Sequence, residues 1–428
     1  MRALAVTALI AGALLRIATL SLSVPAVDNP WRAWSYHAAT RGPWNVYGAK
    51  GHTVRFAELD EPVVYPPLAL DELAVIGRVH LALHGGRFDN DAALTRTIKG
   101  AIVLLDGVLA ALLFVAVRRA AGGASAWWAA LAYWLNPAAV LITTLGFVDV
   151  LVAIPAAGAV IAASSGRPWL SGALFAAAVM TKPQGLFVAP AVALALWNAA
   201  GGRARGERIA APAAAAAMTA GVIVAPLVAA GTTWFMLRSV AVLAGHDALS
   251  ALAFNLWWLV GALLQAGSAT EVVTHAQAMA RGVPNPRIVG PLIMAAAVLW
   301  GLTTARHARD LGLHAALAAF VVAAYFTLSV QVHENHFFLA LPLLALAAAL
   351  HREFAPVLVA LSVTWALNLY LVYGLYGDGA ADLTGVTRID PTVLLAVVNC
   401  VVFGWFGAVF ARACRVASSP DGVPAAGA

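Results

Sequence analysis

The chain has 428 residues, of which 62% are hydrophobic and 11% are charged, and its formal net charge is +6. Soluble globular domains carry about 25% charged residues, whereas apolar runs of spanning length recur along this whole sequence. The composition therefore excludes a soluble globular protein. The basic residues cluster in short links between apolar segments, a pattern that records orientation in a membrane and does not indicate nucleic-acid binding.

Hydropathy predicts an all-α integral membrane protein with about 12 spans, because a helix needs roughly 17–25 apolar residues to cross a bilayer. The segment up to residue 26 has the basic start, apolar stretch and small-residue end of a signal peptide. However, Arg16 interrupts the apolar stretch, which argues against cleavage and favours a first span at residues 3–24. The other spans are predicted at residues 98–117, 124–143, 148–163, 168–181, 184–199, 209–230, 288–305, 311–330, 337–350, 354–373 and 391–411.

The short arginine-bearing links orient these spans, since such links stay on the cytoplasmic side. Both termini then fall in the cytoplasm. The outer side receives two long segments, residues 25–97 and 231–287, and the short links at residues 146–149, 181–183, 331–336 and 374–390. We expect one transmembrane domain, in a bacterial plasma membrane, with interfacial helices in the first outer segment. Residues 254–267 are expected to form a re-entrant or interfacial helix.

Asp28 follows the first span directly, and Trp31, Trp34 and His37 come next. Aromatic residues favour the boundary between membrane and water. A carboxyl group shielded at that depth has a raised pKa and can accept a proton from a sugar hydroxyl. The alternative is a structural role, in which Asp28 caps a helix that begins near Pro30.

Two further features lie in or near the first outer segment. Tyr65 precedes a pair of prolines, which predicts a rigid turn into the next helix, and a purely structural turn is the default interpretation. Asp106 lies inside a predicted span, where an acidic side chain needs a partner. Arg16 or Lys99 is the expected partner of Asp106.

Two outer turns carry basic side chains at the level of the lipid headgroups. Lys182 and Gln184 flank a proline at one turn, and His333 and Glu334 open the other. A lysine and a histidine at this depth suit a lipid phosphate, while ordinary snorkelling is the alternative for the lysine. The spacing H-E-N-H differs from the H-E-x-x-H of zinc proteases, so no metal site is predicted.

Asp149 lies at the outer end of a predicted helix, and Asn255 and Trp257 lie near the end of the second outer segment. Amide and indole groups can bond to and stack on a sugar, or they can belong to an interfacial belt. Cys400 and Cys414 would be about 21 Å apart on one helix, at 1.5 Å per residue, which is too far for a disulfide.

Taken in order, these segments resemble the GT-C superfamily of membrane glycosyltransferases. The nearest branch includes GPI mannosyltransferase II, the ER glucosyltransferases of N-glycan assembly, and bacterial polyprenyl-phosphate-mannose mannosyltransferases (glycosyltransferase family 87-like). The matching pieces are Asp28 before a Trp/Tyr-rich helix ending in Gly42-Pro43-Trp44, Tyr65-Pro66-Pro67-Leu68, Asp106, Asn136-Pro137 with Gly146-Phe147-Val148-Asp149, Lys182-Pro183-Gln184, Ala253-Phe254-Asn255-Leu256-Trp257 and Val332-His333-Glu334.

The resemblance implies a GT-C-type helical bundle that transfers a hexose, with mannose expected, from a polyprenyl-phosphate donor to a lipid or glycan acceptor on the outer face. Asp28 would match the general base and His333 the contact to the donor phosphate, with Lys182 and Glu334 beside it. Supporting or substrate-binding roles are implied for Asp149, Tyr65, Asn255, Trp257, Gln184 and His37. No cofactor or metal is expected. The chain departs from the family pattern at Val27, often glycine, and at Phe147, often glutamine.

Two other functions fit the same sequence. A flippase or transporter of a lipid-linked sugar would place ionisable residues near the bilayer midplane and would contain broken helices. A non-catalytic membrane scaffold would need no chemistry at the outer turns.

Overall fold

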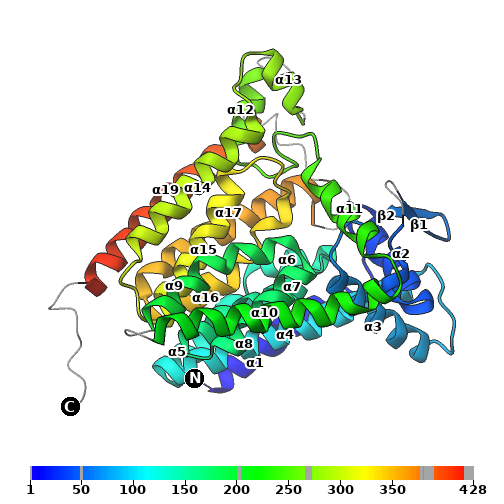
Figure 1. Ribbon diagram of the computed structural model, residues 1–428, viewed down its shortest axis with the longest axis horizontal. Helices are drawn as coiled ribbons and strands as arrows, with labels where there is room; N and C mark the ends of the chain where they lie inside the picture. The colour runs from blue at the N-terminus through cyan, green and yellow to red at the C-terminus, as the bar shows by residue number, and fades with distance from the viewer. Residues whose placement is uncertain are drawn as a thin grey trace.

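Each apolar segment predicted to span the membrane folds as a helix or a pair of helices, because a helix satisfies its own backbone polar groups in lipid. This computed structural model describes residues 2–48, 52–199, 204–265, 272–375, 379 and 390–418. The bundle in Figure 1 is built from α1 (Arg2–Ala18), α4 (Ala92–Ala121), α5 (Gly123–Trp134), α6 (Pro137–Leu145), α7 (Val150–Ser164), α8 (Pro168–Thr181), α9 (Ala189–Asn198), α10 (Ala204–Ala229), α14 (Pro286–Thr304), α15 (Leu311–Leu328), α16 (Ala340–Leu350), α17 (Ala355–Tyr373) and α19 (Pro391–Ser418).

The chain is an integral multi-pass membrane protein. Among the described residues, six helices are long and apolar enough to cross a membrane, and the pair α5–α6, bent by 44°, makes a seventh if it is one span. In the described part of the chain, the other predicted spans are shorter helices. The α5–α6 bend follows from Asn136, which accepts hydrogen bonds from the backbone N–H groups of Ala138 and Ala139 and starts a new helix at Pro137.

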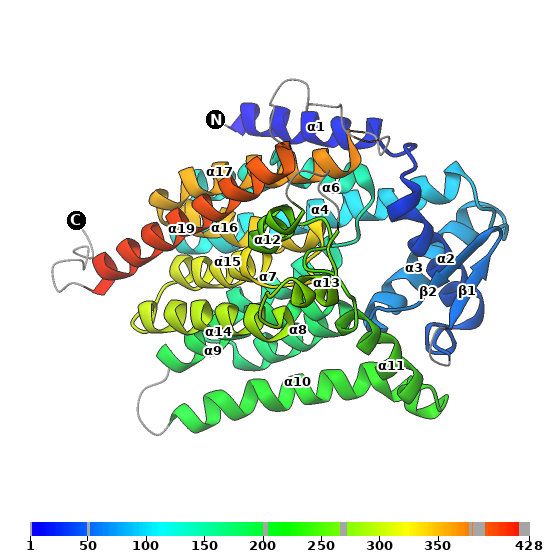
Figure 2. The ribbon, with the colours of Figure 1, turned by 90° about the horizontal axis from the view of Figure 1, so that it is seen from above.

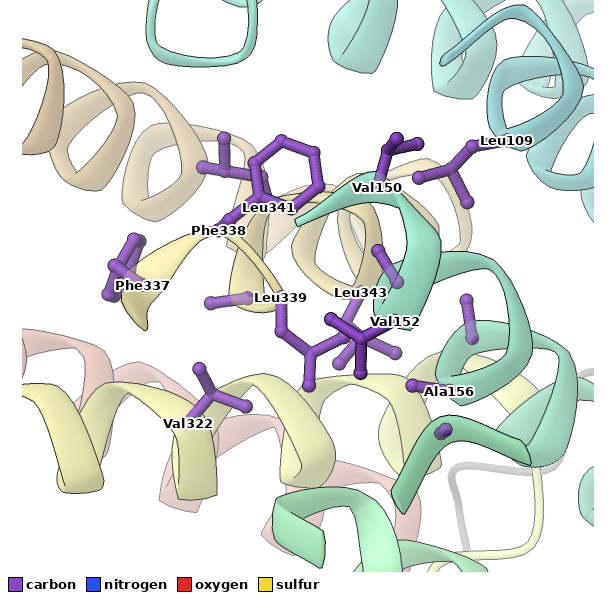
Figure 3. Packing of buried hydrophobic residues seen from close by; sticks show 14 of the residues in the cluster. Leu109, Val150, Val152, Ala156, Val322, Phe337, Phe338, Leu339, Leu341 and Leu343 are labelled. Atoms are coloured by element: carbon purple, nitrogen blue, oxygen red, sulfur yellow. The ribbon is translucent and has the colours of Figure 1, made fainter. Parts of the chain in front are cut away.

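The core of the bundle lies where α16 packs against α7, α15 and α4. Figure 3 shows Phe338 and Leu343 facing Val150 and Val152 of α7, with Val322 of α15 close by. Lipid offers no hydrophobic drive between helices, so close packing of small and large side chains holds them together. This core fixes the start of α16, and with it the turn that carries His333.

An ion pair joins α1 to α4 inside the bundle. Of the two partners expected for Asp106, the structure pairs it with Arg16. Nε of Arg16 lies 3.2 Å from Oδ2 of Asp106, and both side chains are fully buried. Asp106 also accepts hydrogen bonds of 2.6 Å from the hydroxyls of Tyr133 and Thr143. The Arg16 guanidinium stacks on Trp134, 4.1 Å from its ring centre. These contacts give the pair a structural role, because they compensate most of the buried charge.

A small layer of short helices and a β-hairpin lies beside one end of the bundle (Figures 1 and 2). We call this end of the bundle the hairpin end. The layer consists of α2 (Pro25–Arg41), η1 (Pro43–Asn45), β1 (Thr53–Phe56), β2 (Leu59–Pro62) and α3 (Pro67–Leu83). The two strands pair antiparallel, from Thr53 opposite Pro62 to Phe56 opposite Leu59. The sequence predicted helices here but not this hairpin. Helix α1 begins and α19 ends at the opposite end of the bundle.

The second long segment forms α11 (Thr233–Ala244), α12 (Leu256–Leu264) and α13 (His275–Ala280). Helix α12 has nine residues, too few to cross a bilayer. A helix was expected at residues 254–267, of which residues 266 and 267 lie outside the described part, and its re-entrant or interfacial position stays a prediction. Most of the link expected at residues 374–390 also lies outside it. Cys400 and Cys414 both lie on α19, so the two residues are on one helix, as the sequence predicted.

Candidate active site

Asp28 lies in the first turn of α2, where Pro25 occupies the first helical position. Its Oδ2 atom accepts a hydrogen bond of 3.1 Å from the backbone N–H of Val24 and lies 3.5 Å from Nη2 of Arg32, one turn later. The side chain is only 4% exposed. The alternative role, in which Asp28 caps a helix that begins near Pro30, is wrong, because α2 begins at Pro25 with Val24 as its N-cap. Asp28 instead supports the first turn of α2 through one carboxylate oxygen.

The other carboxylate oxygen of Asp28 faces the backbone of Gly146. Gly146 has a φ of 91°, and a Cβ atom at this position would lie 2.7 Å from Oδ1 of Asp28 and 3.0 Å from Cε of Lys99. Both the left-handed backbone and the close approach require glycine. The loop between α6 and α7 thus packs directly on the candidate base.

Two cations surround Asp28. The Lys99 ammonium group donates to the backbone oxygens of Leu22 and Thr144, and Arg32 donates to the hydroxyls of Ser23 and Thr95. Burial raises the pKa of Asp28, and the charges of Lys99 and Arg32 oppose part of this rise. A carboxylate with a raised pKa is a stronger base, which suits removal of a proton from a hydroxyl group.

A second polar cluster forms around Lys182, at the end of α8. Pro183 stops the helix there, since the residue before a proline disfavours the α conformation. Nζ of Lys182 lies 2.6 Å from Oδ1 of Asp149, and Nδ2 of Asn335 donates to Oδ2 of Asp149 at 2.9 Å. The Lys182 ammonium also lies 5.4 Å from the ring centre of Tyr65. Lys182 is therefore a paired cation that joins three segments of the chain.

At the start of the turn η3 (Glu334–Phe337), the neighbouring side chains of His333 and Glu334 differ in exposure. Glu334 is buried, accepts a hydrogen bond of 2.8 Å from the hydroxyl of Tyr373, and accepts another on its backbone oxygen from Trp365. His333 is 42% exposed, and its ring lies 5.5 Å from that of His246. Although part of the ring is exposed, the surrounding chain removes water from it, and this desolvation, then the charges of His246 and Lys182, lower the pKa of His333. At neutral pH its ring is uncharged and offers an N–H donor.

The loop at residues 146–149 connects the two clusters. Its first residue, Gly146, touches Asp28, and its last, Asp149, pairs with Lys182. Between them, Phe147 packs edge-on against Tyr373, with ring centres 5.8 Å apart. The base and the cation therefore sit at the two ends of one four-residue segment.

Aromatic side chains provide a second connection. Trp31, one turn after Asp28, and Trp34 both contact Tyr65, with ring centres 5.4 and 5.2 Å apart. Tyr65 lies in turn beside Lys182. These ring contacts link α2 to the Lys182 cluster, and both indoles are buried.

Several buried polar atoms in this region have no hydrogen-bond partner within the described structure. They are Nε1 of Trp31, Nε1 of Trp34, Nε of Arg32, Oε2 of Glu72 and Oε1 of Gln184. Burial, and then Asp71, raise the pKa of Glu72 to about 8, so its carboxyl group is protonated at neutral pH. Buried polar atoms without a partner are costly, so their concentration in this region needs an explanation beyond packing.

Asn255 and Trp257 hold the short helix α12 in place. Oδ1 of Asn255 accepts from the backbone N–H groups of Trp257 and Trp258, and its Nδ2 donates to the backbone oxygen of Phe326. The indole N–H of Trp257 donates to the backbone oxygen of Leu328 at 2.8 Å. These contacts account for both side chains structurally, and a contact of either with a sugar stays a prediction.

His37 lies away from the Lys182 cluster, on the side of α2 that faces the hairpin. Its Nε2 atom lies 2.6 Å from the backbone oxygen of Arg55. No group of three His, Cys, Asp or Glu side chains in the described ranges is placed to hold a metal ion.

Sequence reasoning missed four residues of this region as site residues: Arg32, Lys99, Asn335 and Tyr373. Arg32 carried a usable signal, because an arginine four residues after an aspartate on a helix faces it. Asn335 and Tyr373 carried none, since their partners are 186 and 39 residues away in the sequence.

No family model matches this sequence, and no curated protein does. Among solved structures, ArnT from Cupriavidus metallidurans bound to undecaprenyl phosphate is similar, with a TM-score of 0.53 and 15% identity over 97% of this chain and 79% of that chain. The apo state of ArnT from the same organism gives a TM-score of 0.49 and 17% identity over 97% and 78%. The first likeness shows the fold, a GT-C-type helical bundle, as the sequence predicted.

Proposed function

We propose that this protein is an inverting glycosyltransferase that moves a hexose, with mannose as the proposed sugar, from a polyprenyl-phosphate donor to a lipid or glycan acceptor. The observation that carries the proposal is the pairing of a buried carboxylate, Asp28, with a basic cluster across one short loop in a GT-C fold. The likeness to ArnT supports a polyprenyl-phosphate donor, because that structure has undecaprenyl phosphate bound.

Asp28 acts as the general base. Its carboxylate removes the proton from an acceptor hydroxyl while the hydroxyl oxygen forms a bond to the anomeric carbon. The bond from that carbon to the phosphate oxygen breaks, and its electron pair leaves with the polyprenyl phosphate. Attack from the face opposite the leaving group inverts the configuration, as in inverting glycoside chemistry with an alcohol in place of water.

Lys182 and His333 receive the departing phosphate. The leaving group gains negative charge as the bond breaks, and donors placed where charge develops stabilise the transition state. The Lys182 ammonium has hydrogen atoms beyond the one used by Asp149, and the neutral ring of His333 offers an N–H group. Glu334 and Asp149 hold these two donors in position, and the mechanism uses no metal.

Trp31 and Trp34 are the proposed platform for the hexose. Their unpaired indole N–H groups, with the protonated carboxyl group of Glu72 and the amide oxygen of Gln184, offer both donors and acceptors to sugar hydroxyls. Because sites that hydrogen-bond hydroxyl groups reject analogues that lack them, a deoxy-sugar donor should be a poorer substrate than the hexose donor.

We place the hairpin end on the outer face of a bacterial plasma membrane, with both termini in the cytoplasm. The arginine-bearing links predict this orientation. A cysteine introduced at the exposed Ala57 of the hairpin tests it, because a membrane-impermeant maleimide labels that residue in intact cells only if the hairpin end faces outward.

The function is tested with purified protein in liposomes, supplied with radiolabelled polyprenyl-phosphate-mannose or polyprenyl-phosphate-glucose and a membrane lipid extract as acceptor. Label in a new lipid or glycan supports the transferase. Asp28→Asn keeps the size of the side chain and an oxygen for Val24, so we expect it to fold and to lose about 10²–10⁴ in rate. Asp89→Asn, an exposed change in the same segment, is the control. Full activity of Asp28→Asn, or movement of intact donor without transfer, would refute the proposal.

A further inference from the structure

A polar cavity of about 370 Å³ lies between the end of α2, η1 and the hairpin. Its lining includes His37, Arg41, Asn45, His52, Arg55 and Asp60. The volume is at the lower end of the roughly 300–1,000 Å³ of small-molecule sites. The cavity is separate from the Lys182 cluster, and the mechanism above uses none of these side chains.

The charged groups of this lining differ in their partners. Arg55 pairs with Asp60, Nε to Oδ2 at 3.3 Å. The Arg41 guanidinium has no carboxylate partner in the described part of the chain, and its backbone oxygen accepts a hydrogen bond from Asn45. The cavity thus combines a guanidinium group available to an anion with a carboxylate and an amide that suit hydroxyl groups.

Tyr47 connects this cavity to the candidate active site. Its side chain lines the cavity, and its hydroxyl donates a hydrogen bond of 2.8 Å to the backbone oxygen of Tyr65. Tyr65 is the ring beside Lys182. His37 follows Asp28 by nine residues on α2, which is about 14 Å at 1.5 Å per residue. The cavity is therefore too far from Asp28 to hold a reacting hydroxyl, but it is close enough to hold a more remote part of the same molecule.

We propose that this cavity binds an acidic sugar, a saccharide unit that bears a phosphate or a carboxylate, as the remote part of the acceptor. Arg41 pairs with the acid group, and Asp60 and Asn45 bond the hydroxyls. A neutral sugar leaves the Arg41 charge without a partner, while a bare anion gains nothing from Asp60. The binding site stands on the cavity itself; its role as an acceptor site rests on the proposed function.

Binding of a remote part of the acceptor can contribute to the rate of transfer. Interactions with a non-reacting part of a substrate orient the reacting part and raise the rate of transfer. Loss of the Arg41 contact should therefore affect the acceptor and leave use of the donor unchanged.

The binding experiment needs no donor and no turnover. Protein in nanodiscs is titrated with mannose 6-phosphate, glucuronate, mannose and inorganic phosphate, and the dissociation constants are measured by ligand-observed NMR. We expect one or both acidic sugars to bind about ten- to a hundredfold more tightly than mannose, the range for a hydrogen bond to a charged group. The preferred acid identifies the acid group.

Four variants sharpen the test. Arg41→Gln should remove the preference for the acidic sugar over mannose, whereas Arg96→Gln, an exposed arginine on α4 outside the cavity, should keep it. Asp60→Ala should remove the preference of the acidic sugar over inorganic phosphate. Equal binding of mannose and the acidic sugars, or an unchanged preference in Arg41→Gln, would overturn the proposal. Asp28→Asn should bind the acidic sugar normally, which separates this result from failure of the transferase.

Discussion

The ion pair between Lys182 and Asp149 allows a structural role to be separated from a role in donor binding. The side chains are 3% and 6% exposed and their charged atoms are 2.6 Å apart. Lys182→Met keeps most of the volume of the side chain but leaves Asp149 as a buried charge whose remaining side-chain hydrogen bond, among the described residues, comes from Asn335. Breaking a buried pair in this way costs about 3–5 kcal/mol. We therefore expect this single variant to be strongly destabilised.

Removing both charges should restore most of that loss. In Lys182→Met/Asp149→Asn the new amide oxygen can still accept the hydrogen bond from Asn335, so no buried charge remains. Replacing a buried ion pair by neutral side chains is often close to neutral for stability. The double variant should thus be more stable than Lys182→Met by a few kcal/mol, as a double-mutant cycle over the four proteins would report.

The assay is unfolding in detergent followed by tryptophan fluorescence, alongside the Michaelis constant for the polyprenyl-phosphate donor. If Lys182 holds the donor phosphate, the double variant regains stability but keeps a raised donor constant, because the ammonium group is still absent. If the lysine only holds the bundle together, stability and donor use recover together. Equal stability of the two variants would refute the reasoning about the buried charge itself.

Three further predictions concern the base and the turn that carries His333. Gly146→Ala forces a left-handed backbone on alanine, which costs about 1–2 kcal/mol, and pushes a methyl group against Asp28. We therefore expect kcat to fall more than the loss of stability explains. An unchanged kcat would contradict the close approach of Gly146 to Asp28. The transfer rate should rise with pH through the pKa of Asp28, since only the ionised carboxylate accepts a proton, and burial places this inflection above the usual value near 4; an inflection that persists in Asp28→Asn would assign it to another group. His333→Ala should raise the donor constant by about tenfold and leave the unfolding temperature almost unchanged, because the ring is 42% exposed; an equal rise in the acceptor constant would argue against a specific contact with the donor.

The positions of the helices were predictable because the bilayer leaves few alternatives. A run of about 20 apolar residues in lipid must satisfy its own backbone, and the helix does this locally. The end of α8 at Pro183 was predicted, because a proline acts within one turn. The break at Asn136 was not, since the span was predicted as continuous over residues 124–143, although the capping side chain that causes the break also acts locally. The hairpin at Thr53–Phe56 and Leu59–Pro62 escaped prediction, since two four-residue strands in a polar segment leave little periodicity to detect.

For the candidate site, the sequence by itself determined which polar side chains stand at the ends of apolar helices, and so near one surface of the membrane. It did not determine their partners. Those partners depend on contacts between distant segments. Such contacts decide whether Lys182 stands alone or pairs with Asp149. They also decide whether Asn255 faces a sugar or caps a helix, and whether His37 lies near Asp28 or faces the hairpin. A hydrogen bond between Asn335 and Asp149 joins residues 186 positions apart. Such contacts follow from how whole helices pack, and only the tertiary structure decides that packing.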